Sequence, residues 1–307
     1  MSTAARAAGA RLSWGAPPRF RPLFLERIRS IMKQLLRRGI ETMPAPWPVW
    51  IQGTYRYLRY PRVRWRRRLR RRILGTLGSP GRVSQGPFRG LRVVELGDCS
   101  AILPKLVGTY ESELVPALET ICRSDCDRIV NIGAAEGYYA VGMALRNPRA
   151  QVVGFEISAS ARHFLRRLAR RNGVSGRIVI RSECTLEALG DALAGARRPA
   201  VICDCEGAED RLLRPDRIEP LRRAFIVVET HDGLETDEGI LEGITGRLHE
   251  RFAATHGIEV IASRCRSREE LPPNCAALTD AEAAEAMDEG RPWAQWLFLA
   301  PKERRAD

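Results

Sequence analysis

Apolar and amphipathic stretches alternate along the chain from residue 129 onward. Short apolar runs predict seven strands, at 129–132, 152–155, 177–180, 200–203, 225–228, 258–262 and 296–299. Helical spacing of apolar positions predicts helices between them, at 137–146, 159–171, 185–194 and 239–252. This alternation predicts a Rossmann-like α/β domain, with a mostly parallel sheet covered by helices on both faces.

The first 91 residues follow a different pattern. Apolar positions recur at helical spacing over 23–40 among several arginines, and prolines with Trp47 and Trp50 follow. Residues 62–72 then include eight arginines in eleven positions. The sequence therefore predicts two parts: a basic N-terminal extension at 1–91, partly helical or disordered, and a folded domain at 92–307.

The charge is divided between these two parts. Residues 1–92 contain 22 of the 50 basic side chains and two acids, which gives this part a net charge of +20, whereas the rest of the chain carries −7. An arginine-rich extension suits an anionic partner, either an anionic membrane surface or, as the weaker alternative, nucleic acid. Arginine is also favoured over lysine throughout, since only three lysines occur.

Several classes of protein are excluded or disfavoured. The longest apolar runs fall short of a membrane-spanning helix, and the N-terminus lacks the apolar core of a secretory signal. The eight cysteines form no C-x-x-C pairs, so no zinc site is predicted and we interpret the thiols as reduced and structural. We therefore expect a cytoplasmic protein that is peripheral at the inner membrane surface if the extension binds lipid.

A glycine turn follows the first predicted strand. In Val130-Asn-Ile-Gly133-Ala-Ala-Glu-Gly137-Tyr-Tyr, an apolar strand runs into glycine and a helix begins at once. Such a turn brings backbone N–H groups close to a bound ligand. Ala135 occupies the middle position of the G-x-G-x-x-G pattern, which disfavours a nicotinamide dinucleotide. A tight turn without a ligand is the alternative.

Two acids follow the next two strands. Glu156 ends the second strand, 23 positions after Gly133, where an acid in a nucleoside-binding sheet accepts hydrogen bonds from the ribose hydroxyls. Glu183 follows the third strand, at the place expected for an adenine ring. The alternative for each is an ordinary surface acid.

Carboxylates and a histidine follow the fourth and fifth strands. Asp204, Glu206 and Glu209 come directly after 200–203, and His231 comes shortly after 225–228. Because the carboxyl ends of parallel strands meet at one edge, these side chains are predicted to gather there. His231 and Asp204 are the candidate bases. Alternatively, the four side chains would hold a divalent cation that lowers the pKa of a hydroxyl group.

These motifs resemble those of FkbM-type methyltransferases, a family of class I S-adenosylmethionine-dependent enzymes. The matching segments are Gly133–Tyr139, Gly154–Glu156, the Asp-x-Glu-Gly-x-Glu run at 204–209, and Val227–His231. The likeness covers about 108–264 and the strand at 296–299. Asn131 stands where the family more often has Asp, and the arginine-rich extension is no part of the family core.

The resemblance implies a seven-stranded sheet whose last strand is antiparallel, with S-adenosylmethionine bound at its carboxyl edge. It implies that the cofactor-binding residues are Glu111, Gly133, Ala135, Gly137, Tyr138, Glu156, Glu183 and Asp204, with the segment 108–111 over the methionine end.

The resemblance also implies the reaction. It predicts O-methylation of a hydroxyl on a sugar, glycolipid or secondary metabolite. From their places at the strand ends, we expect His231, Asp204 and Glu206 to be the catalytic residues, with no metal. The alternative function is an RNA-binding or RNA-modifying protein that uses the arginine-rich extension.

Overall fold

The computed structural model describes residues 69, 71–75, 81–93, 101–236, 239–291 and 293–302. All of them belong to one compact unit, Trp65–Asp307. The predicted helix at 23–40, Trp47, Trp50 and most of the arginine run lie outside the described residues. No helix among those described is long and apolar enough to cross a membrane.

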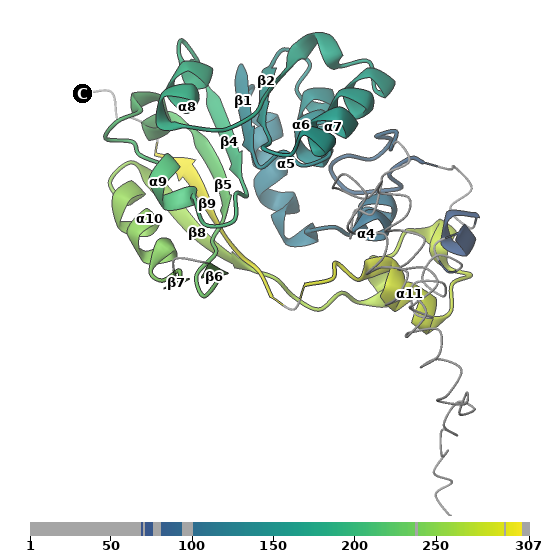
Figure 1. The fold of residues 1–307 in the computed structure, drawn as a ribbon. Coiled ribbons are helices and arrows are strands. Elements are labelled where there is room, and N and C mark those ends of the chain that lie inside the picture. Colours follow the sequence, from purple (N-terminus) through teal and green to yellow (C-terminus); the bar gives the residue numbers. More distant parts are fainter. Residues whose placement is uncertain are drawn as a thin grey trace, which may run out of the picture. The chain divides into compact units, whose positions relative to one another are not determined.

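The core of this unit is a seven-stranded sheet in the order β3-β2-β1-β4-β5-β9-β8 (Figure 1). The first five strands are mutually parallel, and β9 runs antiparallel between β5 and β8. This is the Rossmann-like sheet that the sequence predicted, including the antiparallel last strand. The strands are β1 Arg128–Ile132, β2 Gln151–Phe155, β3 Ile178–Arg181, β4 Pro199–Cys203, β5 Phe225–Glu229, β8 His256–Ala262 and β9 Gln295–Pro301.

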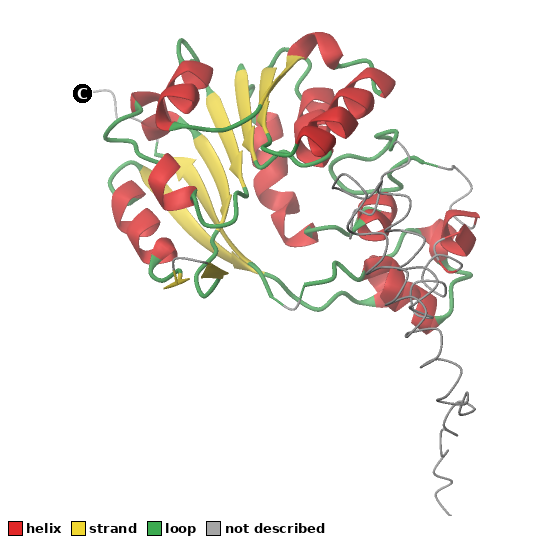
Figure 2. Ribbon diagram, viewed as in Figure 1, coloured by secondary structure: helices red, strands yellow, loops and turns green. Residues whose placement is uncertain are grey.

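Helices cover both faces of the sheet (Figure 2). One face packs against α5 (Val115–Arg123), α6 (Tyr138–Arg146) and α7 (Ala159–Arg171), and the apolar cluster on this side extends to α4 (Ile102–Val107) and α11 (Asp280–Met287). The other face packs against α8 (Leu186–Leu193), α9 (Glu209–Leu212) and α10 (Ile244–Phe252).

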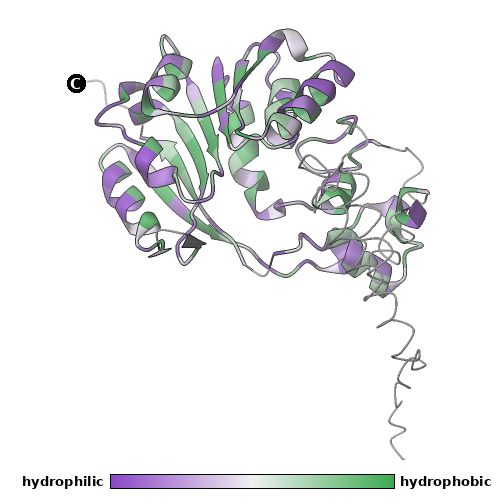
Figure 3. Cartoon of the chain, viewed as in Figure 1, coloured by the Kyte–Doolittle hydropathy of each residue, from purple (hydrophilic) through white to green (hydrophobic). Residues whose placement is uncertain are grey.

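The central strands are apolar because they are buried from both sides. All five residues of β4 and the last four of β1, β2 and β5 are buried, and these strands are drawn as hydrophobic in Figure 3. Asn131 is the polar exception in β1. Its amide nitrogen donates to the carbonyl of Ile202 in β4, 3.3 Å away. An ionised aspartate at this position would have no proton to donate to that carbonyl, so the hydrogen bond explains why asparagine fits here.

The compact unit extends upstream of the predicted domain boundary at residue 92. Val83, Phe88 and Leu91 are almost completely buried and belong to the same apolar cluster as α6 and α7. The Phe88 ring occupies the space beside Gly142, where a Cβ atom would lie 2.5 Å from that ring. The segment 81–93 is therefore packed as part of the core.

The predicted helix over 239–252 is wrong in its first turn. Residues Glu235–Thr236 (β6) and Gly239–Ile240 (β7) pair as a short antiparallel hairpin, and α10 begins only at Ile244. The Asp232 carboxylate accepts hydrogen bonds from the backbone N–H groups of Ile244 and Thr245, at 2.6 and 2.9 Å. This side chain satisfies the first helical donors and sets the start of α10.

Candidate functional site

The glycine turn after β1 lies against the end of β4. Gly133 has φ +73°, and a Cβ atom there would lie 1.6 Å from the backbone carbonyl oxygen of Asp204. Asp204 in turn donates its N–H to the carbonyl of Ile132 at 3.0 Å. Only glycine fits this contact, so the turn and the start of the acidic segment share one backbone interface.

The second glycine of the turn sets the start of α6. Gly137 has φ +98°, and a Cβ atom there would lie 2.2 Å from a methyl group of Leu165 in α7. No side chain caps the N-terminus of α6, so its first N–H groups remain available to a ligand.

Glu156 extends from the end of β2 toward this turn, as the sequence predicted. One carboxylate oxygen accepts the backbone N–H of Ala135 at 2.8 Å, and the other accepts that of Ser158 at 2.7 Å. A carboxylate offers about four lone-pair sites, and this one is half-exposed, so each oxygen retains capacity for one more donor. Ile157, the next residue, is 81% exposed and lies at the same strand end.

The other residues expected at the cofactor lie in different surroundings. The ring of Tyr138 is buried and packs edge-on against Phe88 and Tyr110, with ring centroids 5.2 and 5.6 Å away, so only its backbone at the start of α6 remains for a ligand. Glu183 is exposed in the loop after β3. Glu111 is buried and belongs to the ion-pair network described below.

The acids after β4 and the histidine after β5 meet at the carboxyl edge, as predicted. His231 Nδ1 lies 2.7 Å from Glu209 Oε1. The same Glu209 oxygen accepts the N–H groups of Cys205 and Gly207, at 3.3 and 3.1 Å. His231 Nε2 faces Asp204 Oδ1 at 3.6 Å and Glu206 Oε2 at 3.5 Å. We call Asp204, Glu206, Glu209 and His231 the histidine–carboxylate cluster.

The cluster shifts the protonation of its own members. Burial disfavours the imidazolium form of His231, but the hydrogen bond and charge of Glu209, together with Asp204, outweigh it and raise the pKa of His231 to about 9. Desolvation and the carboxylates of Glu229 and Glu111 raise the pKa of Asp204 to about 7. His231 is therefore a cation at neutral pH, and Asp204 is the group that titrates there.

The space between three members of the cluster has the dimensions of a cation site. One ligand atom from each of Asp204, Glu206 and His231 lies within 4.8 Å of the other two. In the protonated state, the imidazolium itself supplies the positive charge at this place.

A second network of charged side chains, which the sequence did not predict, lies at the sheet edge beside the end of β5. Arg291 contacts both oxygens of Glu229, at 2.9 and 3.1 Å, and also pairs with Glu111 at 2.5 Å and Glu289 at 3.3 Å. Arg266 pairs with Glu289 at 2.6 Å. Glu229 and Glu111 are buried, and desolvation raises the pKa of Glu229. Carboxylates thus outnumber cationic groups at this edge.

A buried ion pair between Lys105 and Glu136 connects the glycine turn to α4. Lys105 Nζ in α4 lies 2.5 Å from the Glu136 carboxylate, and both side chains are almost completely buried. The ammonium group also lies 4.6 Å from the centre of the Tyr110 ring. This buried pair anchors the turn to α4, and because the partners are 31 positions apart, no local motif indicates it.

Backbone strain is concentrated around the site. Four non-glycine residues among those described have a left-handed φ, and three of them are Glu111, Ala135 and Glu206. Such a conformation is costly for residues with a Cβ atom and is typical of ligand sites.

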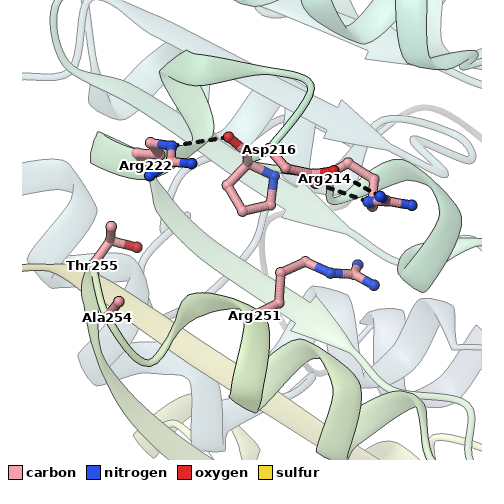
Figure 4. A pocket seen from close by; sticks show the side chains of 7 residues that line it. Arg214, Asp216, Arg222, Arg251, Ala254 and Thr255 are labelled. Atoms are coloured by element: carbon pink, nitrogen blue, oxygen red, sulfur yellow. Dashed lines mark hydrogen bonds and ion pairs between the residues drawn. The ribbon is translucent and has the colours of Figure 1, made fainter.

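The surface hollow of about 340 Å³ in Figure 4 lies elsewhere. Arg214, Asp216 and Arg222 in its lining precede β5, and Thr255 precedes β8. It is therefore at the amino edge of the sheet, opposite the cluster. Two of its arginines are already paired, Arg214 with Asp216 and Arg251 with Asp210.

No protein-family model matches the sequence, and no curated protein matches it. Membership of the FkbM-type family therefore stays a prediction. Among solved structures, the chain is similar to the O-methyltransferase TomG from Streptomyces achromogenes, solved in complex with S-adenosylmethionine, at 16% identity. The match covers 68% of this chain and 92% of TomG, with a TM-score of 0.40.

Two further similar structures are also methyltransferases. An O-methyltransferase from Bacillus cereus, solved in complex with S-adenosylhomocysteine, is 13% identical over 67% of this chain and 92% of its own, with a TM-score of 0.39. A precorrin-6y C5,15-methyltransferase from Geobacter metallireducens is 14% identical over 64% of this chain and 92% of its own, with a TM-score of 0.41.

Proposed function

We propose that this protein is an S-adenosylmethionine-dependent methyltransferase that acts on a hydroxyl group. The observation that carries the proposal is the Glu156 carboxylate, which lies at the end of β2 beside the glycine turn and retains capacity for two more hydrogen bonds. Adjacent ribose hydroxyls are the donors that fit such a carboxylate in an open α/β sheet.

The residues at this edge fit the cofactor from one end to the other. The exposed Ile157 offers an apolar surface to one face of the adenine ring. The free N–H groups at the start of α6 lie beside the glycine turn. The excess of carboxylates, from Asp204 to Glu229, complements a positively charged sulfonium centre. When bound, the cofactor supplies an electrophilic methyl group.

The histidine–carboxylate cluster would prepare the acceptor. Asp204 would take the proton of the acceptor's hydroxyl group as its oxygen attacks. The bound cofactor would supply the methyl group and leave as a neutral thioether, so charge and atoms would balance. The sequence offered His231 and Asp204 as candidate bases, but the pKa of about 9 keeps His231 protonated at neutral pH. We therefore assign the proton transfer to Asp204.

His231 and Glu206 have different roles in this proposal. The His231 imidazolium would stabilise the negative charge that develops on the acceptor oxygen, and Glu209 keeps the ring oriented through Nδ1. Glu206 has a side chain that is 77% exposed, so it is the member placed to contact a sugar or metabolite that enters from solvent.

The test is cofactor binding by the full chain, measured by calorimetry. Glu156→Gln removes the charge that receives the ribose hydroxyls, and the loss of hydrogen bonds to a charged group costs about 1.5–3 kcal/mol. We expect affinity for S-adenosylmethionine to fall about 10- to 100-fold, with Glu250→Gln on the exposed side of α10 as the control for the loss of one carboxylate away from the site. Equal affinities of both variants and the wild type would reject the proposed binding mode.

The acceptor is to be found with labelled cofactor. The full chain is incubated with S-adenosylmethionine carrying a labelled methyl group and with a cell extract, and the label is then followed into glycan, lipid, small-molecule and RNA fractions. Label in a hydroxyl-bearing product supports O-methylation. Label only on amines or carbon centres would contradict the assignment of the acceptor.

A further inference from the structure

Arginines without acidic partners cover the outer side of α7. Arg166, Arg167, Arg170 and Arg171 are all exposed, and we call them the α7 arginine face. No acid in the described part of the chain forms an ion pair with any of them. Their spacing of i, i+1, i+4 and i+5 places them on one side of the helix, opposite the buried Leu165, Leu168 and Ala169.

The span that contains α7 has no acid to neutralise this face, and the carboxylate of Glu156, just before the helix, accepts the backbone N–H groups of Ala135 and Ser158. Residues 157–182 include seven arginines and neither Asp nor Glu. The elements packed against α7, which are α6, β3 and the short 3-10 helix Ser175–Arg177, belong to this span or carry no acid of their own. The positive charge is therefore concentrated in one place within residues 93–307, which carry a net charge of −7.

The basic surface continues from α7 onto the segment 81–93. Asn172, which ends α7, exchanges two hydrogen bonds of 2.8 Å with the backbone of Arg92. Arg92 pairs with Arg82 in an isolated β-bridge, and Arg82 and Arg89 line a surface hollow of about 460 Å³. This segment also contains neither Asp nor Glu.

A genomic preference for arginine does not account for this arrangement. Such a preference adds arginines everywhere, and many of those elsewhere in the described residues form ion pairs, although Arg123, Arg211 and Arg217 do not. The paired arginines include Arg146, Arg149, Arg214, Arg223, Arg247, Arg251, Arg264, Arg266, Arg268 and Arg291. The α7 arginine face differs because four arginines without an ion pair lie together on one side of one helix.

We propose that the α7 arginine face, continued by Arg92, is a docking surface for the phosphate backbone of a nucleic-acid duplex. Guanidinium groups bind phosphate oxygens through paired N–H donors. Such contacts with the sugar–phosphate backbone do not depend on the nucleotide sequence. Neither α7 nor the segment 81–93 has a large exposed apolar side chain to insert into a bilayer, and Val83, Phe88, Leu91 and Val93 are buried. The surface formed by α7 and 81–93 has one exposed ring, that of His163, and no exposed Phe, Tyr or Trp on which bases could stack, which fits a duplex better than a single strand.

This proposal does not depend on methyl transfer, and its test needs no cofactor. The full chain is titrated with a fluorescent 20-base-pair RNA duplex, and with a DNA duplex of the same sequence, at several salt concentrations. The test variant carries Arg166→Gln, Arg167→Gln, Arg170→Gln and Arg171→Gln. The matched control carries Arg123→Gln, Arg197→Gln, Arg211→Gln and Arg217→Gln, which removes the same charge from exposed positions elsewhere.

We expect the test variant to bind a duplex at least about tenfold more weakly than the control at about 0.15 M salt. The slope of log affinity against log salt should also become shallower by about 3.6, because four phosphate contacts are lost and each contributes about 0.9 to the slope. Equal weakening of the two variants would overturn the proposal, since net charge would then explain the result. Wild-type duplex affinity of the test variant would overturn it too. Loss of binding to anionic phosphatidylglycerol vesicles, with duplex affinity retained, would assign the face to a membrane instead.

Discussion

Glu209 controls the charge of His231, and replacing it by glutamine tests this directly. The carboxylate lies 2.7 Å from Nδ1 and is the principal group that raises the pKa of His231 to about 9. A hydrogen bond to a charged group is worth about 1.5–3 kcal/mol, and 1.36 kcal/mol corresponds to one pKa unit. Glu209→Gln should therefore lower the pKa of His231 by about 1–2 units, to between about 7 and 8.

The assay is an NMR titration of the histidine side chains in the full chain, which has four histidines. The His231 resonance is identified as the one absent from His231→Gln. His256 is an internal reference, because it is buried, bonds to the Ala224 carbonyl at 2.9 Å and has a lowered pKa. If the wild-type pKa of His231 is near 6.5, or remains near 9 in Glu209→Gln, the role assigned to Glu209 is refuted.

The same change has a consequence for stability. A histidine whose pKa is raised by folding contributes its full stabilisation below about pH 6.5, and this is lost as pH rises through about 9. In Glu209→Gln, where the pKa of His231 is expected between about 7 and 8, this stabilisation should already be lost as pH rises through that range. Chemical denaturation of wild type and variant at pH 6 and pH 9 measures this, and the difference between them should be larger at pH 6.

Three further predictions concern the rest of the site. Gly133→Ala should destabilise the fold by more than the roughly 1–2 kcal/mol that a left-handed backbone costs an alanine, because its Cβ atom meets the Asp204 carbonyl. Gly173→Ala has open space around it and should cost only that backbone strain. Urea denaturation compares the two variants. Arg291→Met should destabilise the protein by about 3 kcal/mol at pH 7, and less at pH 5, because the stranded Glu229 carboxylate can then take up a proton. Treatment with a chelator should leave methyl transfer unchanged, and a loss restored by Mg²⁺ or Mn²⁺ would instead place a divalent cation in the histidine–carboxylate cluster.

The parallel half of the sheet could be predicted from the sequence because its strands are apolar on both faces. The apolar runs ending at Ile132, Phe155, Cys203 and Val228 are short and continuous, with helical patterns between them, and each is a strand. Their carboxyl ends then had to meet, which is why His231 and the acids after β4 were expected together. The packing of 81–93 could not be predicted in this way, because its local sequence resembles the basic extension before it. Only contacts with elements distant in the sequence, α6 and α7, place this segment in the core.

The charges of the site could not be predicted in the same way. His231 has an ordinary pKa near 6.5 in isolation, and only the contact with Glu209, 22 positions away, makes it a cation at neutral pH. Arg291 pairs with Glu111 across 180 positions of the chain. No short motif indicates such a partner, since both side chains are brought together by the packing of β9 beside β5.

The position of β9 has a consequence for how the protein is made. β9 lies between β5 and β8, yet it is synthesised after both, and Arg291 is synthesised only just before it. At about 5–20 residues per second, residues 230–294 take roughly 3–13 seconds to synthesise, and throughout that time the edge of β5 lacks its partner. Open strand edges recruit other strands, so we expect this edge of the nascent chain to be prone to pairing with other chains until β9 is in place. The glycine turn and Glu156 can be in place during this interval, whereas the ion pairs of Glu111 and Glu229 form only when β9 arrives.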